Sequence, residues 1–402
     1  MTRKEFLAAS GATLVASAFG GIRAVRRSGS SVPLQGKGFP SWLEPKIEAA
    51  LVRYKEWKGS EEVVVFTLTT DLHDWHPAID SDDGPDVSSK MHIPYALHVG
   101  DVFEADFAAD LGDIGSDWTV GKDGALVGAT REEMLCRRSS QVELYDKARR
   151  PVFQCVGNHD LTYVVTENGV AKWRNDDPRN FGNCFAPLAH GAEVVWGEGR
   201  DYGYWDVPGK NFRVIVLDSF EWAHTYGFKP SQLAFLSGAL VVPPDFAVVV
   251  LMHSDLQPPM GCWLHNGVMQ FRNSFSADRA RFGHKEAQRM LEDFVGRGRG
   301  ESNGLAWDFT SLRNNRLAAV LCGHAHYDNF LRQYDVLHVV RQGHGSINAR
   351  TEFPHENGAR HTEVSLSDDT CIDVVAVKPK LGDLAIFRIG AGDELADFKE
   401  DC

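Results

Sequence analysis

Apolar runs of strand length alternate with stretches of helical spacing between residues 61 and 330. Uninterrupted apolar runs are typical of strands buried on both faces, whereas apolar positions three and four apart among charges indicate helices. The predicted strands cover residues 61–70, 106–113, 151–156, 202–207, 212–217, 246–252 and 317–322. The predicted helices cover residues 95–105, 131–149, 231–240 and 284–294, and Ser231 is the expected cap of the third.

After residue 330 the pattern changes to strands without long helices, at residues 336–340, 362–366, 371–377 and 383–389. We expect these strands to complete a second sheet. The earlier alternation of strand and helix requires parallel strands joined by right-handed crossovers. The sequence therefore predicts an α/β fold in which two sheets pack face to face with helices outside.

The first 40 residues differ from the rest and predict an export signal and linker, followed by one domain over residues 41–402. A basic start precedes a short apolar stretch at residues 8–15, and Ala16-Ser17-Ala18 fits a small-x-small cleavage site. The start resembles a twin-arginine signal with one substitution. Residues 24–40 are rich in Ser, Gly, Pro and Arg, which indicates a linker. We expect a periplasmic or secreted protein without stable membrane insertion once the signal is removed.

The chain has 402 residues, 43% hydrophobic and 24% charged, which is ordinary for a soluble enzyme. Its net charge of -13 makes nucleic acid an improbable partner. An anionic substrate remains compatible, since bound cations can reverse the local field. The 7 cysteines lack the paired spacing of zinc fingers. Cys155 and Cys322 lie in apolar runs and should be buried, while Cys184 and Cys262 could pair in an oxidising compartment.

Short clusters of metal-binding residue types follow the predicted strands. In chain order they are Asp71-Leu72-His73, Gly112-Asp113, Gly157-Asn158-His159-Asp160, His253 and Gly323-His324-Ala325-His326. Strand ends are rigid, so side chains placed there can converge on one point. Carboxylate, imidazole and amide groups together suit divalent metals. Two such ions about 3.5–4 Å apart can promote attack on a phosphate ester.

In residue type and order these clusters resemble the calcineurin-like metallophosphoesterase family, over the segment from Val63 to Tyr327. The resemblance implies two mixed sheets in a four-layer αββα fold, and two divalent metal ions such as Mn, Fe or Zn. It also implies three groups of metal ligands. The first ion is held by Asp71, His73 and His326, the second by Asn158, His253 and His324, and both by Asp113. A carboxylate has two oxygens and can serve both ions, which an imidazole cannot.

His159 is expected to be catalytic and not a ligand. The resemblance implies that it holds the phosphoryl group or protonates the leaving oxygen, and that Asp160 orients its ring. The implied reaction is in-line attack of a metal-bound hydroxide on a phosphomonoester or phosphodiester. No tyrosine occurs in Ile114-Gly115-Ser116-Asp117, where purple acid phosphatases carry an iron ligand. We therefore do not expect a ferric site.

Two Gly-Asp pairs compete for the bridging position, at Asp101 and Asp113. If Asp101 were the bridge, residues 74–94 would have to form the crossover helix, but this stretch contains three prolines and an acidic run. If Asp113 is the bridge, residues 95–105 can form the helix and 106–113 the strand. This solution fits a right-handed crossover between parallel strands, and we favour Asp113.

Two other functions remain open: a nuclease of the same fold, or a non-catalytic metal-binding or ligand-binding module. The acidic charge disfavours a nuclease, because affinity for nucleic acid depends on Lys and Arg. The arginines after His253 favour it. The complete set of candidate ligands disfavours a non-catalytic module. Long connections at residues 161–200 and 257–316 are expected to shape the substrate site, and the substrate itself is not predicted.

Overall fold

The computed structural model describes residues 39–73, 89–115, 118–120, 126–222, 225–256, 260–265, 268–273, 283–324, 328–341, 370–390 and 398–399. All but two residues of the expected signal and linker, and the predicted strand at residues 362–366, lie outside these ranges. His326 also lies outside them. None of the helices within these ranges is long and apolar enough to cross a membrane.

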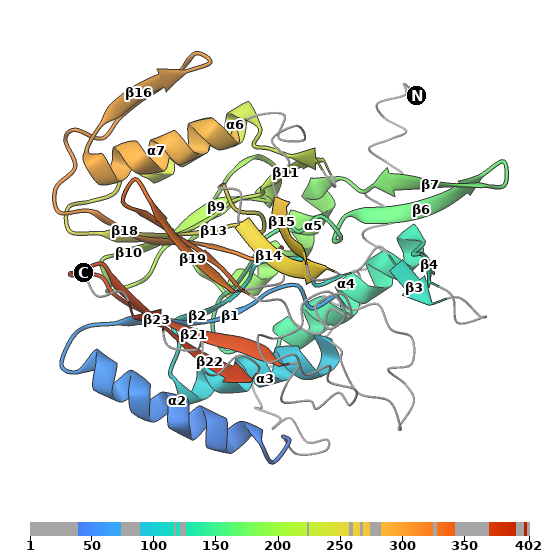
Figure 1. Cartoon of the computed structure of the whole chain (residues 1–402), viewed down its shortest axis with the longest axis horizontal. Coiled ribbons are helices and arrows are strands. Elements are labelled where there is room, and N and C mark those ends of the chain that lie inside the picture. The colour runs from blue at the N-terminus through green and yellow to red at the C-terminus, as the bar shows by residue number, and fades with distance from the viewer. Residues whose placement is uncertain are drawn as a thin grey trace. The chain divides into compact units, whose positions relative to one another are not determined.

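The first sheet has the strand order β23-β22-β21-β1-β2-β5 (Figure 1). Three of its strands are parallel: β1 (Val64–Thr69), β2 (Phe107–Asp110) and β5 (Val152–Gln154). The other three are antiparallel: β21 (Cys371–Lys378), β22 (Asp383–Gly390) and β23 (Phe398–Lys399). The prediction that the strands at 371–377 and 383–389 complete the second sheet is therefore wrong. They extend the first sheet, because β21 pairs directly with β1.

The second sheet has the order β19-β20-β18-β13-β10-β9-β8. Its parallel strands are β10 (Phe212–Val216), β13 (Ala247–Leu251), β18 (Arg316–Cys322) and β20 (Val336–Val340). Antiparallel strands flank them: β8 (Val195–Trp196), β9 (Gly203–Asp206) and β19 (Asn329–Gln333). Both sheets are mixed, as expected.

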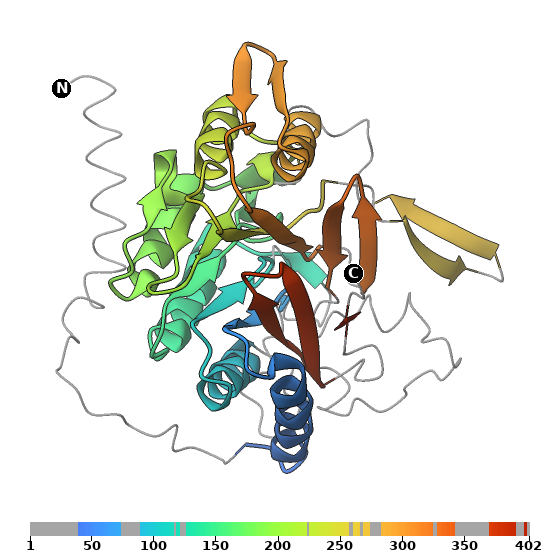
Figure 2. The same cartoon turned by 90° about the vertical axis from the view of Figure 1, so that its left-hand side faces the viewer.

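Two helical layers enclose the two sheets, which confirms the predicted αββα arrangement (Figures 1 and 2). Helices α2 (Leu43–Lys58) and α3 (Ser89–Val102) cover the first sheet, and α6 (Pro230–Ala239) and α7 (His284–Gly296) cover the second. Alternate side chains of a strand face opposite ways. Thus Phe66 of β1 packs between the sheets, while Val65 faces the helices.

Local sequence signals explain where α4 and α6 begin. Helix α4 (Arg131–Tyr145) begins with a capping box between Thr130 and Glu133. Helix α6 begins at Pro230, so the prediction that Ser231 caps it is wrong; proline suits the first helical position because its missing N–H needs no partner there. Helix α3 begins before Pro94 and ends at Val102, earlier than expected.

The two long connections contain regular structure, of which the sequence predicted only the helix at residues 284–294 (Figure 2). The first contains β6 (Thr162–Glu167), β7 (Val170–Asn175), α5 (Pro178–Phe185), two 3-10 turns (Ala186–Ala189 and Glu198–Arg200) and β8. The second contains β14 (Met260–His265), β15 (Val268–Asn273), α7, β16 (Arg299–Ser302) and β17 (Leu305–Asp308). Two further hairpins are β3 (Trp118–Val120) with β4 (Leu126–Gly128), and β11 (Phe220–Trp222) with β12 (Thr225–Tyr226).

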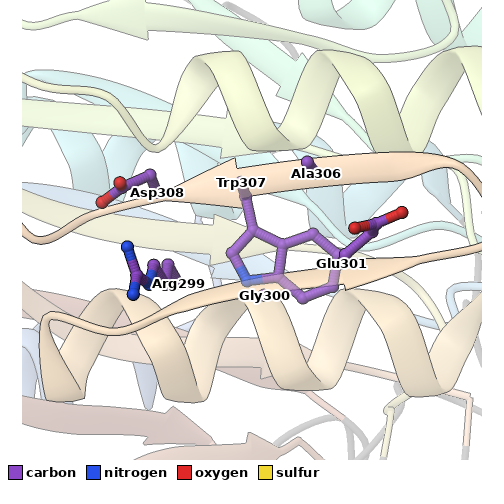
Figure 3. A pocket seen from close by; sticks show the side chains of 6 residues that line it. All are labelled: Arg299, Gly300, Glu301, Ala306, Trp307 and Asp308. Atoms are coloured by element: carbon purple, nitrogen blue, oxygen red, sulfur yellow. The ribbon is translucent and has the colours of Figure 1, made fainter.

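One surface hollow lies on the β16–β17 hairpin and is lined by Arg299, Gly300, Glu301, Ala306, Trp307 and Asp308 (Figure 3). Trp307 anchors this hairpin to α7, because its Nε1 donates a hydrogen bond to Asp293 Oδ2 at 2.7 Å. The hollow contains none of the predicted site residues.

Cys155 and Cys322 are buried and free, as expected. Cys184 is also free, and its thiol donates to the Asn180 carbonyl at 2.8 Å. Cys184 is therefore not paired with Cys262.

Candidate metal centre

The predicted site residues follow the carboxyl ends of parallel strands in both sheets. In the first sheet, Asp71 and His73 follow β1, Asp113 follows β2, and the segment 158–160 follows β5. In the second, His253 follows β13 and His324 follows β18. Parallel neighbours present the same ends at one edge of a sheet, so these segments can meet.

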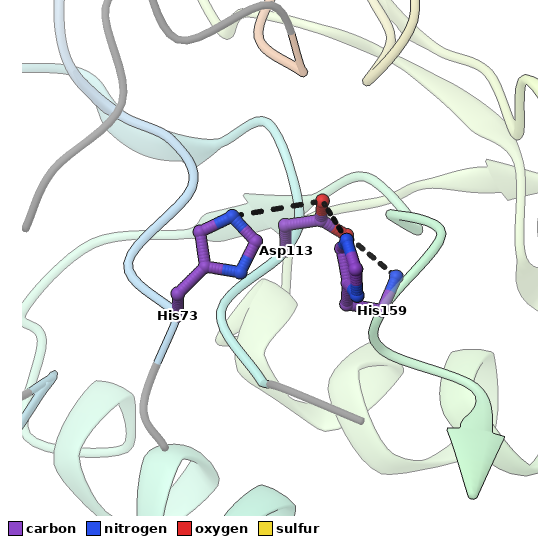
Figure 4. Close-up of side chains that lie close together, drawn as sticks. All are labelled: His73, Asp113 and His159. Carbon is purple, nitrogen blue, oxygen red and sulfur yellow. Dashed lines mark hydrogen bonds and ion pairs between the residues drawn. The ribbon is translucent and has the colours of Figure 1, made fainter. Parts of the chain in front are cut away.

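Asp113 lies at the centre of the site, with its side chain 1% exposed (Figure 4). Its Oδ2 lies 3.0 Å from His253 Nε2, 3.9 Å from His73 Nε2 and 4.0 Å from His159 Nε2. Its Oδ1 accepts a hydrogen bond from the His159 backbone N–H at 2.8 Å. One carboxylate oxygen therefore faces three imidazoles.

Two groups of candidate ligands share Asp113. One consists of His73, Asp113 and His159, the other of Asp113, His253 and His324. Within each group the ligand atoms lie within 4.8 Å of one another. A carboxylate with two imidazoles suits a divalent transition metal, so the residues fit the expected ions. The geometry differs from the expectation in one respect: His159 lies within ligating range of the first group.

The charges of the site stabilise one another. Burial would lower the pKa of His253, but the Asp113 and Asp71 carboxylates outweigh it and raise that pKa to about 9. Burial would raise the pKa of Asp113, but the His253 and His159 imidazoles outweigh it and hold that pKa below its ordinary value. An ionised buried carboxylate needs positive charge beside it, which a metal ion also supplies.

Asp160 fastens two of these loops to each other. Its Oδ2 accepts the backbone N–H groups of Asp113 at 2.9 Å and Gly157 at 2.8 Å, and its Oδ1 accepts that of Gly115 at 2.9 Å. We expected Asp160 to orient the His159 ring. Instead, both carboxylate oxygens hold backbone, because the turn after β5 directs this side chain under the loop after β2.

The ligand loops also hold one another in a strained conformation. The Asp71 N–H donates to the Gly112 carbonyl at 2.8 Å, and Asp71 Oδ2 accepts the His324 N–H at 2.9 Å. Asp71, His73, Asp113 and His324 all have positive φ, at 52°, 44°, 54° and 67°. Such φ values are unfavourable for residues other than glycine and persist where the surroundings enforce them, often at functional sites.

Two glycines permit the close approach of these loops. A Cβ on Gly157 would lie 2.1 Å from Asp113 Oδ1, and one on Gly323 would lie 1.9 Å from Thr70 Oγ1. Neither position has room for a side chain.

No protein-family model matches the sequence, and no curated protein matches it either. Among solved structures, a dimetal phosphatase from Danio rerio is similar with a TM-score of 0.50 and 12% identity, over 83% of this chain and 98% of that one. The chain has the calcineurin-like metallophosphoesterase fold. A purple acid phosphatase from yellow lupin (Lupinus luteus) seeds is also similar, with a TM-score of 0.43 and 13% identity over 84% of this chain. The chain spans 53% of that protein's length.

Of the two aspartates considered for the bridging position, Asp113 lies in the site and Asp101 lies outside it. Asp113 belongs to both ligand groups. Asp101 lies at the end of α3, is 36% exposed, and forms ion pairs with Arg150 at 3.0 Å and Arg149 at 3.8 Å. Asp101 is therefore engaged outside the site.

Asn158 is buried, and its backbone carbonyl accepts a hydrogen bond from Thr162 Oγ1 at 3.0 Å. His326 lies outside the described residues. The ligand roles of both remain predictions.

Sequence reasoning missed the groups that support the histidines of this fold. His253 Nδ1 donates to the Leu111 carbonyl at 2.8 Å, which directs Nε2 toward Asp113. The Phe220 ring packs at 5.7 Å from the His253 ring and 6.1 Å from the His324 ring. Phe220 lies between Ser219 and Glu221, outside the apolar run of β10, so no local signal marks it.

Asp110 is a second missed residue. It is buried at the end of β2, where its carboxylate accepts hydrogen bonds from Tyr145 Oη at 2.5 Å, Thr69 Oγ1 at 3.1 Å and the Gly112 N–H at 2.9 Å. Burial raises its pKa to about 7, although these hydrogen bonds oppose the rise. An aspartate inside an apolar strand was the available signal.

Proposed function

We propose that this chain hydrolyses phosphate esters with two divalent metal ions. The observation that carries the proposal is the position of Asp113, which is buried, faces three imidazoles and belongs to both groups of candidate ligands. The metallophosphoesterase fold supports it. When bound, the two ions would place positive charge beside the phosphoryl oxygens and lower the pKa of a coordinated water molecule to near neutral.

The chain's own residues divide the work. Asp113 would hold both ions, the first together with His73 and the second together with His253 and His324, and the Leu111 carbonyl orients His253. Asp71 and His73 complete the first position, where we also place His326. Asn158 and His324 complete the second.

His159 faces the substrate. Its side chain is 25% exposed, in contrast to the fully buried His253, so a substrate can reach it. Its Nε2 is the atom that donates to a phosphoryl oxygen or to the leaving oxygen. A fixed donor at this position stabilises charge that develops on the phosphoryl group.

The test measures bound metal and turnover on the same preparations. Elemental analysis of the purified enzyme should give two ions per chain, and Mn²⁺-loaded enzyme should hydrolyse an aryl phosphomonoester or an aryl phosphodiester. Asp113→Asn should lose metal and turnover together. Asp101→Asn is the matched control, because it makes the same change in the other Gly-Asp pair and should retain most of both.

His159→Ala separates an enzyme from a non-catalytic module: turnover should fall by about 10²–10⁴-fold with both ions retained. Failure of the metal-loaded wild type on both classes of ester would refute the proposal.

A further inference from the structure

Four charged side chains form a buried cluster, one of which closely follows the last predicted ligand segment in the sequence. They are Asp328, Arg341, Asp373 and Arg388, with side chains 5%, 1%, 4% and 0% exposed. Asp328 directly precedes β19 and Arg341 directly follows β20, both of the second sheet, while Asp373 on β21 and Arg388 on β22 belong to the first. The cluster therefore ties the two sheets together at one point.

Within the cluster, each arginine is hydrogen-bonded to an aspartate in a defined geometry. Arg341 binds Asp373 with two hydrogen bonds, Nε to Oδ2 at 2.6 Å and Nη2 to Oδ1 at 2.8 Å. Arg388 Nε donates to Asp373 Oδ1 at 2.6 Å. Asp328 Oδ1 is shared, at 2.9 Å from Arg388 Nη2 and 3.1 Å from Arg341 Nη1. Bidentate arginine pairs of this kind fix position as well as charge.

Asp373, which binds both arginines, stays ionised at neutral pH. Burial would raise the pKa of Asp373, but Arg341 and Arg388 outweigh it and lower that pKa to about 2. Replacing a buried ion pair by apolar residues often leaves stability unchanged, so stability alone is a weak reason for such a cluster.

The location of the cluster suggests another reason. Asp328 lies four residues after His324 and two after His326 in the sequence. The other end of this segment is fixed at the site, where the Gly323 N–H donates to the His253 carbonyl at 2.9 Å. The Arg341 N–H also donates to the Cys322 carbonyl at 2.8 Å, next to the start of the segment. His324 has a φ of 67°, which its surroundings must enforce.

We propose that Asp328, held by Arg341 and Arg388, is a positioning residue that fixes the His324 segment at metal-binding distance and so sets metal affinity. This inference rests on the proposed function, because it assumes that His324 binds a metal ion. None of the four residues is a candidate ligand. They act on the site through Arg341, whose backbone N–H binds the Cys322 carbonyl two residues before His324.

The test uses metal-free full-length protein and Mn²⁺ alone as the probe. Binding is followed by calorimetry, and electron paramagnetic resonance distinguishes a coupled pair of Mn²⁺ ions from single ions. Asp328→Asn should weaken one Mn²⁺ site by about 10–100-fold, as is usual for groups that orient metal ligands. The spectrum should then change from that of a coupled pair to that of one ion.

Two controls separate positioning from general stability. Asp206→Asn removes the negative charge from a bidentate pair whose aspartate is more exposed, at 40%; Asp206 binds Arg213 at 2.6 and 2.8 Å near the opposite ends of the strands. Leu236→Ala truncates a fully buried side chain of α6. Both should lower the melting temperature and leave both Mn²⁺ affinities unchanged. Arg388→Lys keeps the charge but not the paired geometry, and provides a second variant if Asp328→Asn does not fold.

Wild-type Mn²⁺ affinity in Asp328→Asn or in Arg388→Lys would overturn the inference. So would an equal loss in either control. A wild-type protein that binds no Mn²⁺ would overturn the proposed function as well, whereas a wild type with two ions and an unaffected Asp328→Asn would overturn this inference alone.

Discussion

Gly157→Ala should strongly weaken metal binding, with little effect on the intrinsic conformational energy of the backbone. Gly157 is not among the glycines with positive φ, so alanine causes no conformational strain at this position. The added methyl group would lie 2.1 Å from Asp113 Oδ1 and 2.3 Å from the Asp113 backbone nitrogen. Both atoms belong to the residue at the centre of the site.

The size of the effect follows from these distances. Contacts of a Cβ below 3.0 Å essentially never occur, so Asp113 Oδ1 and the new methyl group must separate by at least the difference from 2.1 Å, which is 0.9 Å. Metal–ligand distances tolerate about 0.2 Å. A misplacement of about 1 Å in an active site can cost about 10²-fold in rate. We therefore expect at least a 100-fold loss in Mn²⁺ affinity at one or both positions, and a similar loss in turnover.

Calorimetric titration with Mn²⁺ and hydrolysis of an aryl phosphate measure the two effects. Gly296→Ala is the control, because a Cβ at that helical position meets nothing within 4 Å. It should bind Mn²⁺ normally and be more stable by about 0.5–1 kcal/mol. Wild-type Mn²⁺ affinity in Gly157→Ala would show that the loops after β2 and β5 are not closely packed, and would refute the reasoning.

Three further outcomes are expected. Asp160→Ala should lose metal as well as turnover, because three backbone N–H groups lose their acceptor; retained metal with lost turnover would instead support a role on the His159 ring. In metal-free protein, the protonated Asp110 side chain contributes stability that is full below its ordinary pKa of 3.8 and is lost as pH rises through about 7. Asp110→Asn should therefore reduce the fall in the free energy of unfolding over this pH range, measured by urea titration. An unchanged fall would contradict the prediction. A chelator should lower the melting temperature, since free metal at 100 times its Kd stabilises the fold by about 2.7 kcal/mol; an equal melting temperature with and without metal would argue against a bound ion.

The sequence predicted those features that depend on local pattern. The apolar runs located the central strands, and the crossover argument placed the strand before Asp113 and the helix before that strand. The structure accordingly brings Asp113 into the ligand groups and leaves Asp101 with its arginines. Crossover handedness is a general physical rule, so it can be applied to a single sequence.

Features that depend on long-range pairing were not predictable. The pairing of β21 with β1 joins Val64 to Val377, and no local pattern specifies which sheet a late strand will join. The role of Asp160 depends on how two loops fold against each other. The ion pairs of Asp328 with Arg341 and Arg388 likewise join positions that are remote in the sequence.

The pairing of β1 with β21 has a consequence for how the protein is made. Strand β1 leaves the ribosome long before its neighbour β21, so the first sheet cannot close until β21 has been synthesised. Contacts between such distant positions form slowly, because the chain between them must first be brought together. Until then the edge of β1 is open to other chains. We expect expression yield to depend more on temperature and chaperones than the stability of the finished molecule suggests.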